Sequence, residues 1–133
     1  MKSGPQFVSL EAALLIHEQM IVAYGGSGAI RDRGLLESAM EMARAQFGGV
    51  FLHDDLGSMA AAYLFHICQN HPFVDGNKRT ALAVSQVFLR GNGHRLAVDK
   101  VDLEALTLGA AAGEIRKDAV VELFRSYLAP LET

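Results

Sequence analysis

The chain has 133 residues, half of them hydrophobic, and this length allows about two-thirds of the unfolded surface to be buried in one globular domain over residues 1–133. Its 12 Lys and Arg against 15 Asp and Glu give a formal net charge of −3, which argues against direct nucleic-acid binding through a broad basic face. No apolar run approaches the roughly 20 residues that cross a bilayer, and the lone Cys68 excludes an internal disulfide, so we expect a cytoplasmic protein without a membrane role.

Apolar residues recur at a period near 3.6 along the chain and strand-like alternation is nearly absent, so the sequence predicts an all-α fold. A first helix is expected to begin after the N-cap Ser9 and to end at Gly25-Gly26. One face of this helix carries Leu10, Leu14, His17, Ile21 and Tyr24. On that apolar face we interpret His17 as a core histidine whose polar atoms are satisfied within the protein.

Two further helices are predicted before residue 72. The second begins after Asp32 and is expected to end at Gly48-Gly49, with an apolar stripe of Leu36, Ala39, Met40, Ala43 and Phe47. The third follows the caps Asp54 and Asp55 and carries Met59, Ala60, Tyr63, Leu64 and Ile67 at core spacing. Its end is expected at Asn70-His71-Pro72, because proline disfavours the helical conformation in the residue before it.

The remaining helices are predicted from the same signals. The fourth is expected from Asn77 to Leu89, before the turn at Gly91-Asn92-Gly93. Asp99 or Asp102 can cap the fifth, whose end lies between Gly109 and Gly113. The sixth is marked by Val120, Val121, Phe124, Tyr127 and Leu128. The sequence therefore predicts a compact single-domain bundle of about six helices.

The segment between the third and fourth helices is the most informative part of the chain. Residues 71–79 combine an imidazole, a carboxylate, a carboxamide, two cations and a glycine within nine positions. A helix N-terminus presents unpaired N–H groups and partial positive charge, and Gly76 allows an anion to approach the backbone closely. Lys78 and Arg79 add full positive charges there. These residues predict a site for a diphosphate or triphosphate.

Four other residues of this segment have expected roles. An imidazole can accept a proton at neutral pH, so His71 can act as the general base for an attacking hydroxyl. Asp75 would be unfavourable beside phosphates unless a cation lay between them, so we assign it to Mg²⁺. Asn77 can hydrogen-bond a phosphate oxygen or cap the following helix, and Phe73 is expected to anchor the loop in the core.

The sequence HPFVDGNKR at residues 71–79 resembles the signature of the Fic superfamily in its death-on-curing variant. Similarity extends to YGG at 24–26, FLRGNG at 88–93 and LTLGAAAGEI at 106–115, so it covers nearly the whole chain. The resemblance implies a compact helical toxin of a prokaryotic toxin–antitoxin pair. It also implies an antitoxin partner whose C-terminal segment folds into a groove on this chain.

Two positions depart from the general Fic pattern and bear on the reaction. Lys78 stands where that pattern has glycine, and Leu82 stands where it has a second arginine. In the general pattern the glycine leaves room for the terminal phosphates and the second arginine grips them, so that AMP is transferred. With Lys78 filling that space, the resemblance implies that ATP binds in the reverse sense and presents its γ-phosphate. It therefore implies a protein kinase that uses ATP and Mg²⁺ to modify a Thr or Ser of a translation factor, elongation factor Tu, and arrests translation.

Two alternatives stay open, and one further site is expected. The chain can instead be a Fic-type adenylyltransferase that attaches AMP to a protein hydroxyl, or a non-catalytic helical binding module. Residues Gly48 to His53 align roughly with the family's flap over the active site. We therefore expect target docking at four residues, Val50, Phe51, Leu52 and His53.

Overall fold

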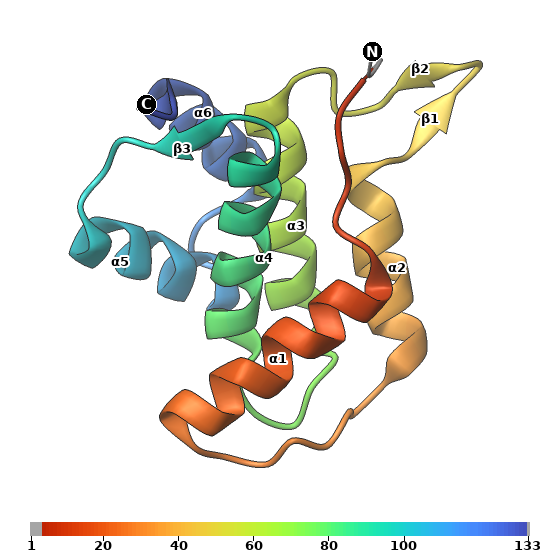
Figure 1. Ribbon diagram of the computed structural model, residues 1–133, viewed down its shortest axis with the longest axis vertical. Coiled ribbons are helices and arrows are strands. Elements are labelled where there is room, and N and C mark those ends of the chain that lie inside the picture. Colours follow the sequence, from red (N-terminus) through yellow and green to blue (C-terminus); the bar gives the residue numbers. More distant parts are fainter. Residues whose placement is uncertain (1–3, 133) are drawn as a thin grey trace.

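The computed structural model describes residues 4–132, which form six helices and two short strand pairs (Figure 1). The helices are α1 (Leu10–Tyr24), α2 (Arg33–Ala43), α3 (Leu56–Asn70), α4 (Asn77–Gly91), α5 (Lys100–Ala111) and α6 (Lys117–Tyr127). The antiparallel pairs are β1 (Gln46–Phe47) with β2 (Val50–Phe51), and β3 (His94–Leu96) with β4 (Leu128–Pro130). The predicted all-α fold with a loop between the third and fourth helices is confirmed. Within residues 4–132, no helix is long and apolar enough to cross a membrane.

Helix α3 is the centre of the molecule. It packs against α2, α4, α5 and α6, while α1 crosses the lower end and contacts α4 and α2 (Figure 1). Ala60, Ala61 and Ala62 are fully buried in α3, as are Tyr63 and Leu64. The small alanine side chains allow the neighbouring helices to approach closely, and the large ones fill the space between them. This core fixes both ends of α3 in place.

Side chains define where the first helices begin. Ser9 and Asp55 accept a backbone N–H from the first turn of α1 and α3, as predicted, and Asp32 does so at α2. Asp54, the other cap expected for the third helix, instead forms an ion pair with Arg125. Asp55 and Ser58 form a reciprocal capping box at α3. Asp99 occupies the N-cap position of α5 without a capping hydrogen bond from its side chain.

The predicted end of the second helix is wrong. Helix α2 ends at Ala43, and Phe47 is 71% exposed on β1 instead of lying in the core. Gly48 and Gly49 have φ values of 58° and 81°, and two successive positive φ values are what a two-residue hairpin turn requires. These glycines therefore join β1 to β2. Strands of two residues are too short to show alternation in the sequence.

Smaller differences occur near the C-terminus. Helix α6 ends one residue before Leu128, which begins β4 and pairs with Leu96 of β3. Helix α5, by contrast, ends at Ala111, between Gly109 and Gly113 as predicted. A Cβ at Gly109 would lie 2.5 Å from Ile115 Cδ1, so this glycine makes room for packing and does not end the helix.

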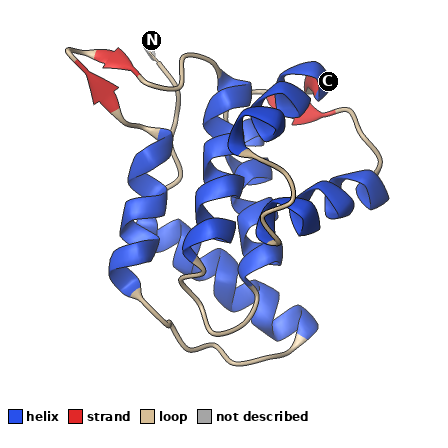
Figure 2. Ribbon diagram, turned by 180° about the vertical axis from the view of Figure 1, so that it is seen from behind, coloured by secondary structure: helices blue, strands red, loops and turns tan. Residues whose placement is uncertain are grey.

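The two ends of the molecule differ in structure. Both strand pairs lie at one end, whereas the long loops at residues 25–32 and 71–76 lie together at the other (Figure 2). We call residues 71–76 the motif loop and residues 25–32 the α1–α2 loop. Their backbones pair through an isolated antiparallel bridge between Ile30 and Phe73. The residues predicted for catalysis and for phosphate and metal binding therefore lie at the end without strands, whereas those predicted for target docking do not.

Candidate active site

The conformation of His71 is unusual. It is the C-cap of α3 with a φ of 49°, and among the described residues it is the one non-glycine with a positive φ. A side chain in this left-handed region costs roughly 1 kcal/mol, and such strain occurs at functional sites. The residue is exposed, and its ring makes no hydrogen bond to residues 4–132. The imidazole is thus open to a ligand.

Arg31 of the α1–α2 loop holds this conformation. Its Nε donates to the carbonyl of His71 at 2.6 Å and its Nη2 to the carbonyl of Asn70 at 2.8 Å. The carbonyl of Pro72 accepts the backbone N–H of Arg31 at 2.7 Å and that of Asp32 at 2.9 Å. The guanidinium therefore satisfies carbonyls that the end of α3 leaves unpaired, and its charge suits the negative end of the helix.

Asp75 is held at both its side chain and its backbone. Its Oδ2 accepts the Ser27 N–H at 2.7 Å, and its main-chain carbonyl lies 2.8 Å from His17 Nε2. No described residue hydrogen-bonds Oδ1. A Cβ added at Gly26, where φ is +105°, would lie 3.0 Å from Asp75 Cβ and 3.2 Å from Oδ2. Glycine at position 26 is thus needed for the loop to pass this close to the carboxylate.

The metal ligands that Asp75 can offer suit a cation that binds together with phosphates. No group of three or more His, Cys, Asp or Glu within residues 4–132 is arranged to hold a metal ion. Mg²⁺ is commonly held by one or two carboxylates together with substrate phosphates. Asp75, exposed and with one free oxygen, is suited to that chemistry and not to a resident all-protein metal site.

The N-terminus of α4 carries uncompensated positive charge. Gly76 is the N-cap, with φ 82°, and no side chain caps the helix. Lys78 and Arg79 are exposed, and neither forms an ion pair within the described part of the chain. The Arg79 guanidinium carbon lies 4.2 Å from the centroid of the Tyr24 ring. Free N–H groups, a helix dipole and two cations together are suited to binding an anion.

Phe73 and Asn77 organise the interior of the motif loop. Phe73 is fully buried. Its N–H donates to Asn77 Oδ1 at 2.9 Å, and Asn77 Nδ2 donates to the Phe73 carbonyl at 2.8 Å. Asn77 is the first residue of α4 and does not cap it, contrary to one of its two expected roles. Both ends of its amide serve the loop, so its contribution in this structure is to shape the backbone around Asp75.

The predicted docking segment does not cover the motif loop. Val50, Phe51, Leu52 and His53 precede the N-terminus of α3, whereas the motif loop follows its C-terminus. The 15 residues of α3 rise about 22 Å between these points. The interpretation of this segment as a flap over the active site is therefore wrong, and the segment that borders the motif loop is the α1–α2 loop (Figure 1).

Sequence reasoning missed several residues that shape the site. Arg31, Ser27 and Tyr24 received no functional role, and His17 was assigned to the core alone. The predicted satisfaction of His17 is confirmed, but its partner is the motif loop. Only the YGG segment at 24–26 indicated that this region matters, because it is part of the resemblance to the Fic superfamily. Helical spacing does not reveal whether a face meets the core or a functional loop.

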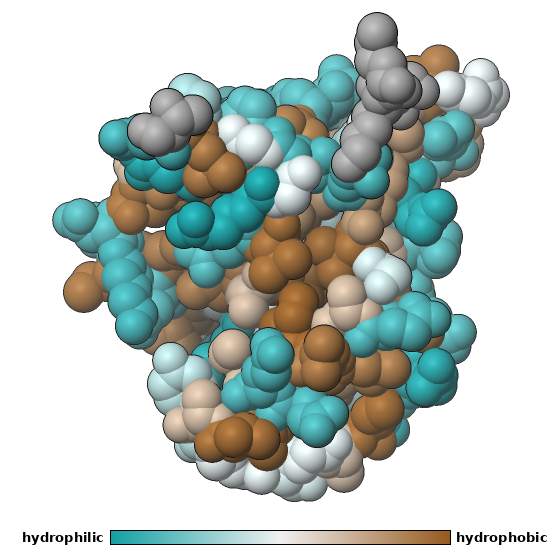
Figure 3. All heavy atoms as spheres, viewed as in Figure 1, coloured by the Kyte–Doolittle hydropathy of each residue, from teal (hydrophilic) through white to brown (hydrophobic). Residues whose placement is uncertain are grey.

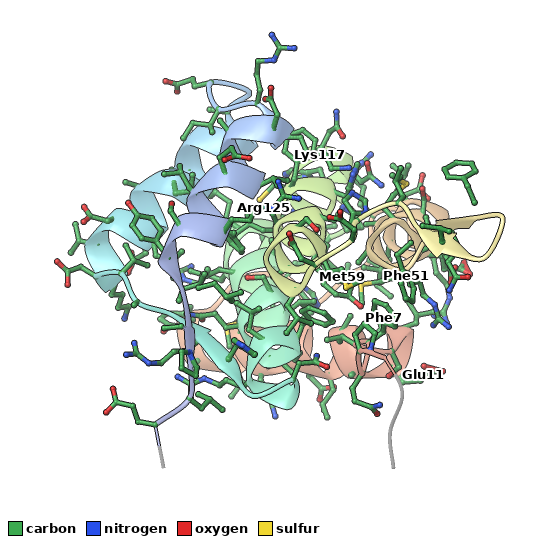
Figure 4. The ribbon with its side chains drawn as sticks, turned by 90° about the horizontal axis from the view of Figure 1, so that it is seen from above. Phe7, Glu11, Phe51, Met59, Lys117 and Arg125 are labelled. Atoms are coloured by element: carbon green, nitrogen blue, oxygen red, sulfur yellow. The ribbon has the colours of Figure 1, made fainter. Side chains whose placement is uncertain are left out.

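Other perturbed groups lie away from the motif loop or are inert. Burial, followed by the charges of Lys117 and His53, lowers the pKa of His66 to about 4. Burial and Lys117 also lower the pKa of His53. Figure 4 looks onto the end opposite the motif loop and labels Lys117 and Arg125 of α6. Burial raises the pKa of Cys68 to about 12, so this thiol remains protonated and is not a nucleophile.

The chain is similar in sequence to known proteins. The chain is 36% identical over 118 residues to "Protein kinase doc" of Escherichia phage P1, covering 89% of this chain and 92% of that protein. It is 45% identical over 78 residues to "Toxin Doc" of Mycolicibacterium smegmatis, covering 59% of this chain and 60% of that protein. Residues 7–89, which include α1, the α1–α2 loop, the motif loop and most of α4, match the sequence model of the Fic/DOC family. The chain belongs to the Fic/DOC family.

Proposed function

We propose that this chain is the toxin of a toxin–antitoxin pair and a protein kinase that transfers the γ-phosphate of Mg²⁺-bound ATP to a Thr or Ser hydroxyl. One observation carries the proposal: a strained, exposed His71 lies one loop away from an uncapped helix N-terminus bearing Lys78 and Arg79. A proton acceptor beside an anion site is what phosphoryl transfer to a hydroxyl needs. The similarity to a protein named a protein kinase supports the same reaction.

The chain's own residues divide the work of the transfer. His71 accepts the proton of the target hydroxyl as its oxygen bonds to the γ-phosphorus. The bond from that phosphorus to the bridging oxygen breaks, and ADP leaves with the electron pair. The N-terminus of α4, Lys78 and Arg79 stabilise the charge on the phosphate oxygens. Asp75 would hold Mg²⁺, which supplies further charge neutralisation when bound with ATP.

Lys78 favours γ-phosphate transfer over AMP transfer. Its exposed ammonium adds charge at the N-terminus of α4, where the general Fic pattern has a glycine. The second arginine of that pattern is replaced by Leu82, which is half-buried and offers no charge. Without that arginine, nothing at position 82 grips terminal phosphates in the orientation that exposes the α-phosphate.

We assign docking of the target to the α1–α2 loop. Ile30, which forms the bridge with Phe73, is 40% exposed, and Val74, the residue after Phe73, is 46% exposed. The Val74 N–H donates to the Ala29 carbonyl at 3.1 Å, so this stretch is extended and fixed next to His71. Elongation factor Tu is the proposed target, on the family resemblance, and the prokaryotic cytoplasm is the proposed location.

The antitoxin is proposed to bind an apolar surface with a segment that orders on binding. Figure 3 shows hydrophobic residues gathered in a hollow near the middle of the face that carries α1 and α4. Exposed apolar side chains on these helices include Leu15, at 56%, and Val87, at 45%. An amphipathic antitoxin segment would cover such side chains, which are otherwise unfavourable in water.

Position-specific labelling of ATP tests the reaction. Purified chain, Mg²⁺ and elongation factor Tu are incubated with ATP labelled at either the α- or the γ-phosphorus, with His71→Ala as the matched control. We expect γ label on a Thr or Ser of the target and none with His71→Ala. Transfer of α label alone would establish the adenylyltransferase. Equal arrest of translation by wild-type chain and His71→Ala would establish a non-catalytic binding module.

A further inference from the structure

We propose that α1 is a positioning element of the active site and that His17 is its central residue. This inference rests on the proposed function, because it concerns how the motif loop is held for phosphoryl transfer. Three residues of α1 contact the motif loop or the start of α4: His17, Ile21 and Tyr24. Their spacing of four and then three residues places them on one face of the helix.

His17 contacts the motif loop in two different ways. The residue is 3% exposed, and its ring stacks on Phe73 with 3.7 Å between centroids and an interplanar angle of 5°. Its Nε2 lies 2.8 Å from the main-chain carbonyl of Asp75, which can only accept, so Nε2 carries the hydrogen. One imidazole thereby fixes two loop residues on either side of Val74.

The next turns of α1 extend this contact. A Cβ at Gly76 would lie 3.3 Å from Ile21 Cδ1 and 3.5 Å from His17 Cδ2, so the loop backbone passes directly against α1. One turn further, the Tyr24 ring lies under the Arg79 guanidinium. A cation over an aromatic face is attracted by the electron density of the ring, which restricts the arginine. The α1 face therefore sets the Asp75 backbone, the Gly76 turn and the Arg79 side chain together.

A purely structural explanation of His17 does not account for the choice of residue. The other buried side chains of α1 are those of Ala13 and Ile16, both apolar. Burying an imidazole is unfavourable unless it forms a hydrogen bond, and a leucine or phenylalanine would fill the same space without that cost. The imidazole supplies a donor for the Asp75 carbonyl. Asp75 is thus aligned at its backbone by His17 and at its carboxylate by Ser27.

Two substitutions separate the hydrogen bond from the packing. His17→Phe keeps an aromatic ring against Phe73 but leaves the Asp75 carbonyl without its donor. His17→Gln loses the ring but keeps an N–H donor at nearly the same reach. Because small displacements of groups at a reacting centre have large effects on rate, we expect His17→Phe to lower kcat about tenfold. We expect His17→Gln to recover at least half of that loss on a logarithmic scale.

His66→Phe is the matched control. The His66 Nε2 is buried without a hydrogen-bond partner, and its ring packs against Phe65, so the substitution exchanges a histidine for an aromatic ring without removing a hydrogen bond. All four proteins are compared by γ-label transfer, with kcat and KM for ATP measured separately. Unfolding midpoints in urea are measured in parallel. We expect His66→Phe to keep kcat within twofold of the wild-type value.

Amide hydrogen exchange gives a readout independent of activity. The Val74 N–H is bonded to the Ala29 carbonyl and the Phe73 N–H to Asn77, so their exchange reports opening of the motif loop. We expect at least fivefold faster exchange at these amides in His17→Phe, but not in His66→Phe. Unchanged kcat and exchange in His17→Phe, or equal loss in His17→Phe and His17→Gln, would overturn the inference. If wild-type chain transfers no γ label, the proposed kinase function fails, while the exchange comparison still decides the role of His17.

Discussion

The two ends of α3 use charge in opposite ways. At the far end, Arg125 lies 3.3 Å from Asp54, 2.9 Å from Asp55 and 3.3 Å from Glu122, so its charge is compensated within the protein (Figure 4). At the motif end, Lys78 and Arg79 have no carboxylate within 4.0 Å in the described part of the chain. Charges that are paired within the protein are already compensated by its own residues. Unpaired charges of one sign at a helix N-terminus instead attract an external anion. The distinction separates a structural cluster from a functional one.

The histidines show the same contrast. His17, at the motif end, is buried with a hydrogen-bond partner, whereas His53 and His66 each bury a ring nitrogen without one. His71 is exposed, with a strained backbone. Burial alone therefore does not identify a functional histidine. The informative features are what the imidazole binds and whether the backbone around it is held in an unfavourable conformation.

The largest expected effect concerns His71. Replacing it with glycine removes the proposed general base, so γ-phosphate transfer should fall by at least about 100-fold. Glycine also relieves the positive φ, a gain of roughly 1 to 2 kcal/mol against an entropic cost of roughly 0.5 to 1 kcal/mol. The free energy of unfolding, measured in urea, should therefore rise slightly. A protein that loses both activity and stability would show that His71 serves the fold, and the contrast between the two ends would fail.

The second effect concerns the approach of the α1–α2 loop to Asp75. Gly26→Ala would bring a methyl group to about 3 Å from the Asp75 side chain, so we expect activity to fall about tenfold and more Mg²⁺ to be needed for half-maximal rate. Gly25→Ala is the matched control. Gly25 also has a positive φ, of 87°, but a Cβ there meets nothing within 4 Å. Both variants share the backbone strain, so equal activity in the two would argue against crowding of Asp75.

The sequence predicts features that depend on residues close together in the chain, and it does not predict contacts between residues far apart in the chain. Helix positions and the caps Ser9, Asp32 and Asp55 were predictable, because capping and periodicity act over a few residues. The motif loop was predictable, because its polar residues are adjacent in the chain. The contacts of His17 with Asp75, 58 residues away, and of Arg31 with His71, 40 residues away, depend on how the helices pack, which periodicity does not reveal. The flap was misplaced for the same reason.

The third effect concerns His66, whose Nε2 is buried without a hydrogen-bond partner in the described part of the chain. The pKa of His66 is lowered to about 4 in the folded chain, from an ordinary value of 6.5. Between pH 6.5 and 4 the unfolded chain binds a proton that the folded chain excludes, so stability falls as the pH falls through this window. With allowance for partial exposure, we expect a loss of about 1 kcal/mol at pH 5. Urea unfolding at pH 7 and pH 5 measures it, and His66→Phe should make the difference smaller.

The smallest effect concerns the ion pairs of Arg125. Arg125→Ala should lower the free energy of unfolding by about 0.5 kcal/mol at low salt and less at high salt, because exposed pairs contribute little and are screened. Burial raises the pKa of Asp55, but its Ser58 hydrogen bonds and Arg125 outweigh burial, so that pKa lies below the ordinary value of 3.8. The contribution of the pair is therefore present near pH 7 and is lost as acid protonates Asp55. The γ-phosphate transfer rate should stay within twofold of wild type, since Arg125 lies at the opposite end of α3 from His71. If Arg125→Ala instead lost much of its activity while its stability stayed intact, the two ends would be coupled through α3. A charge that is paired within the protein could then also serve the reaction.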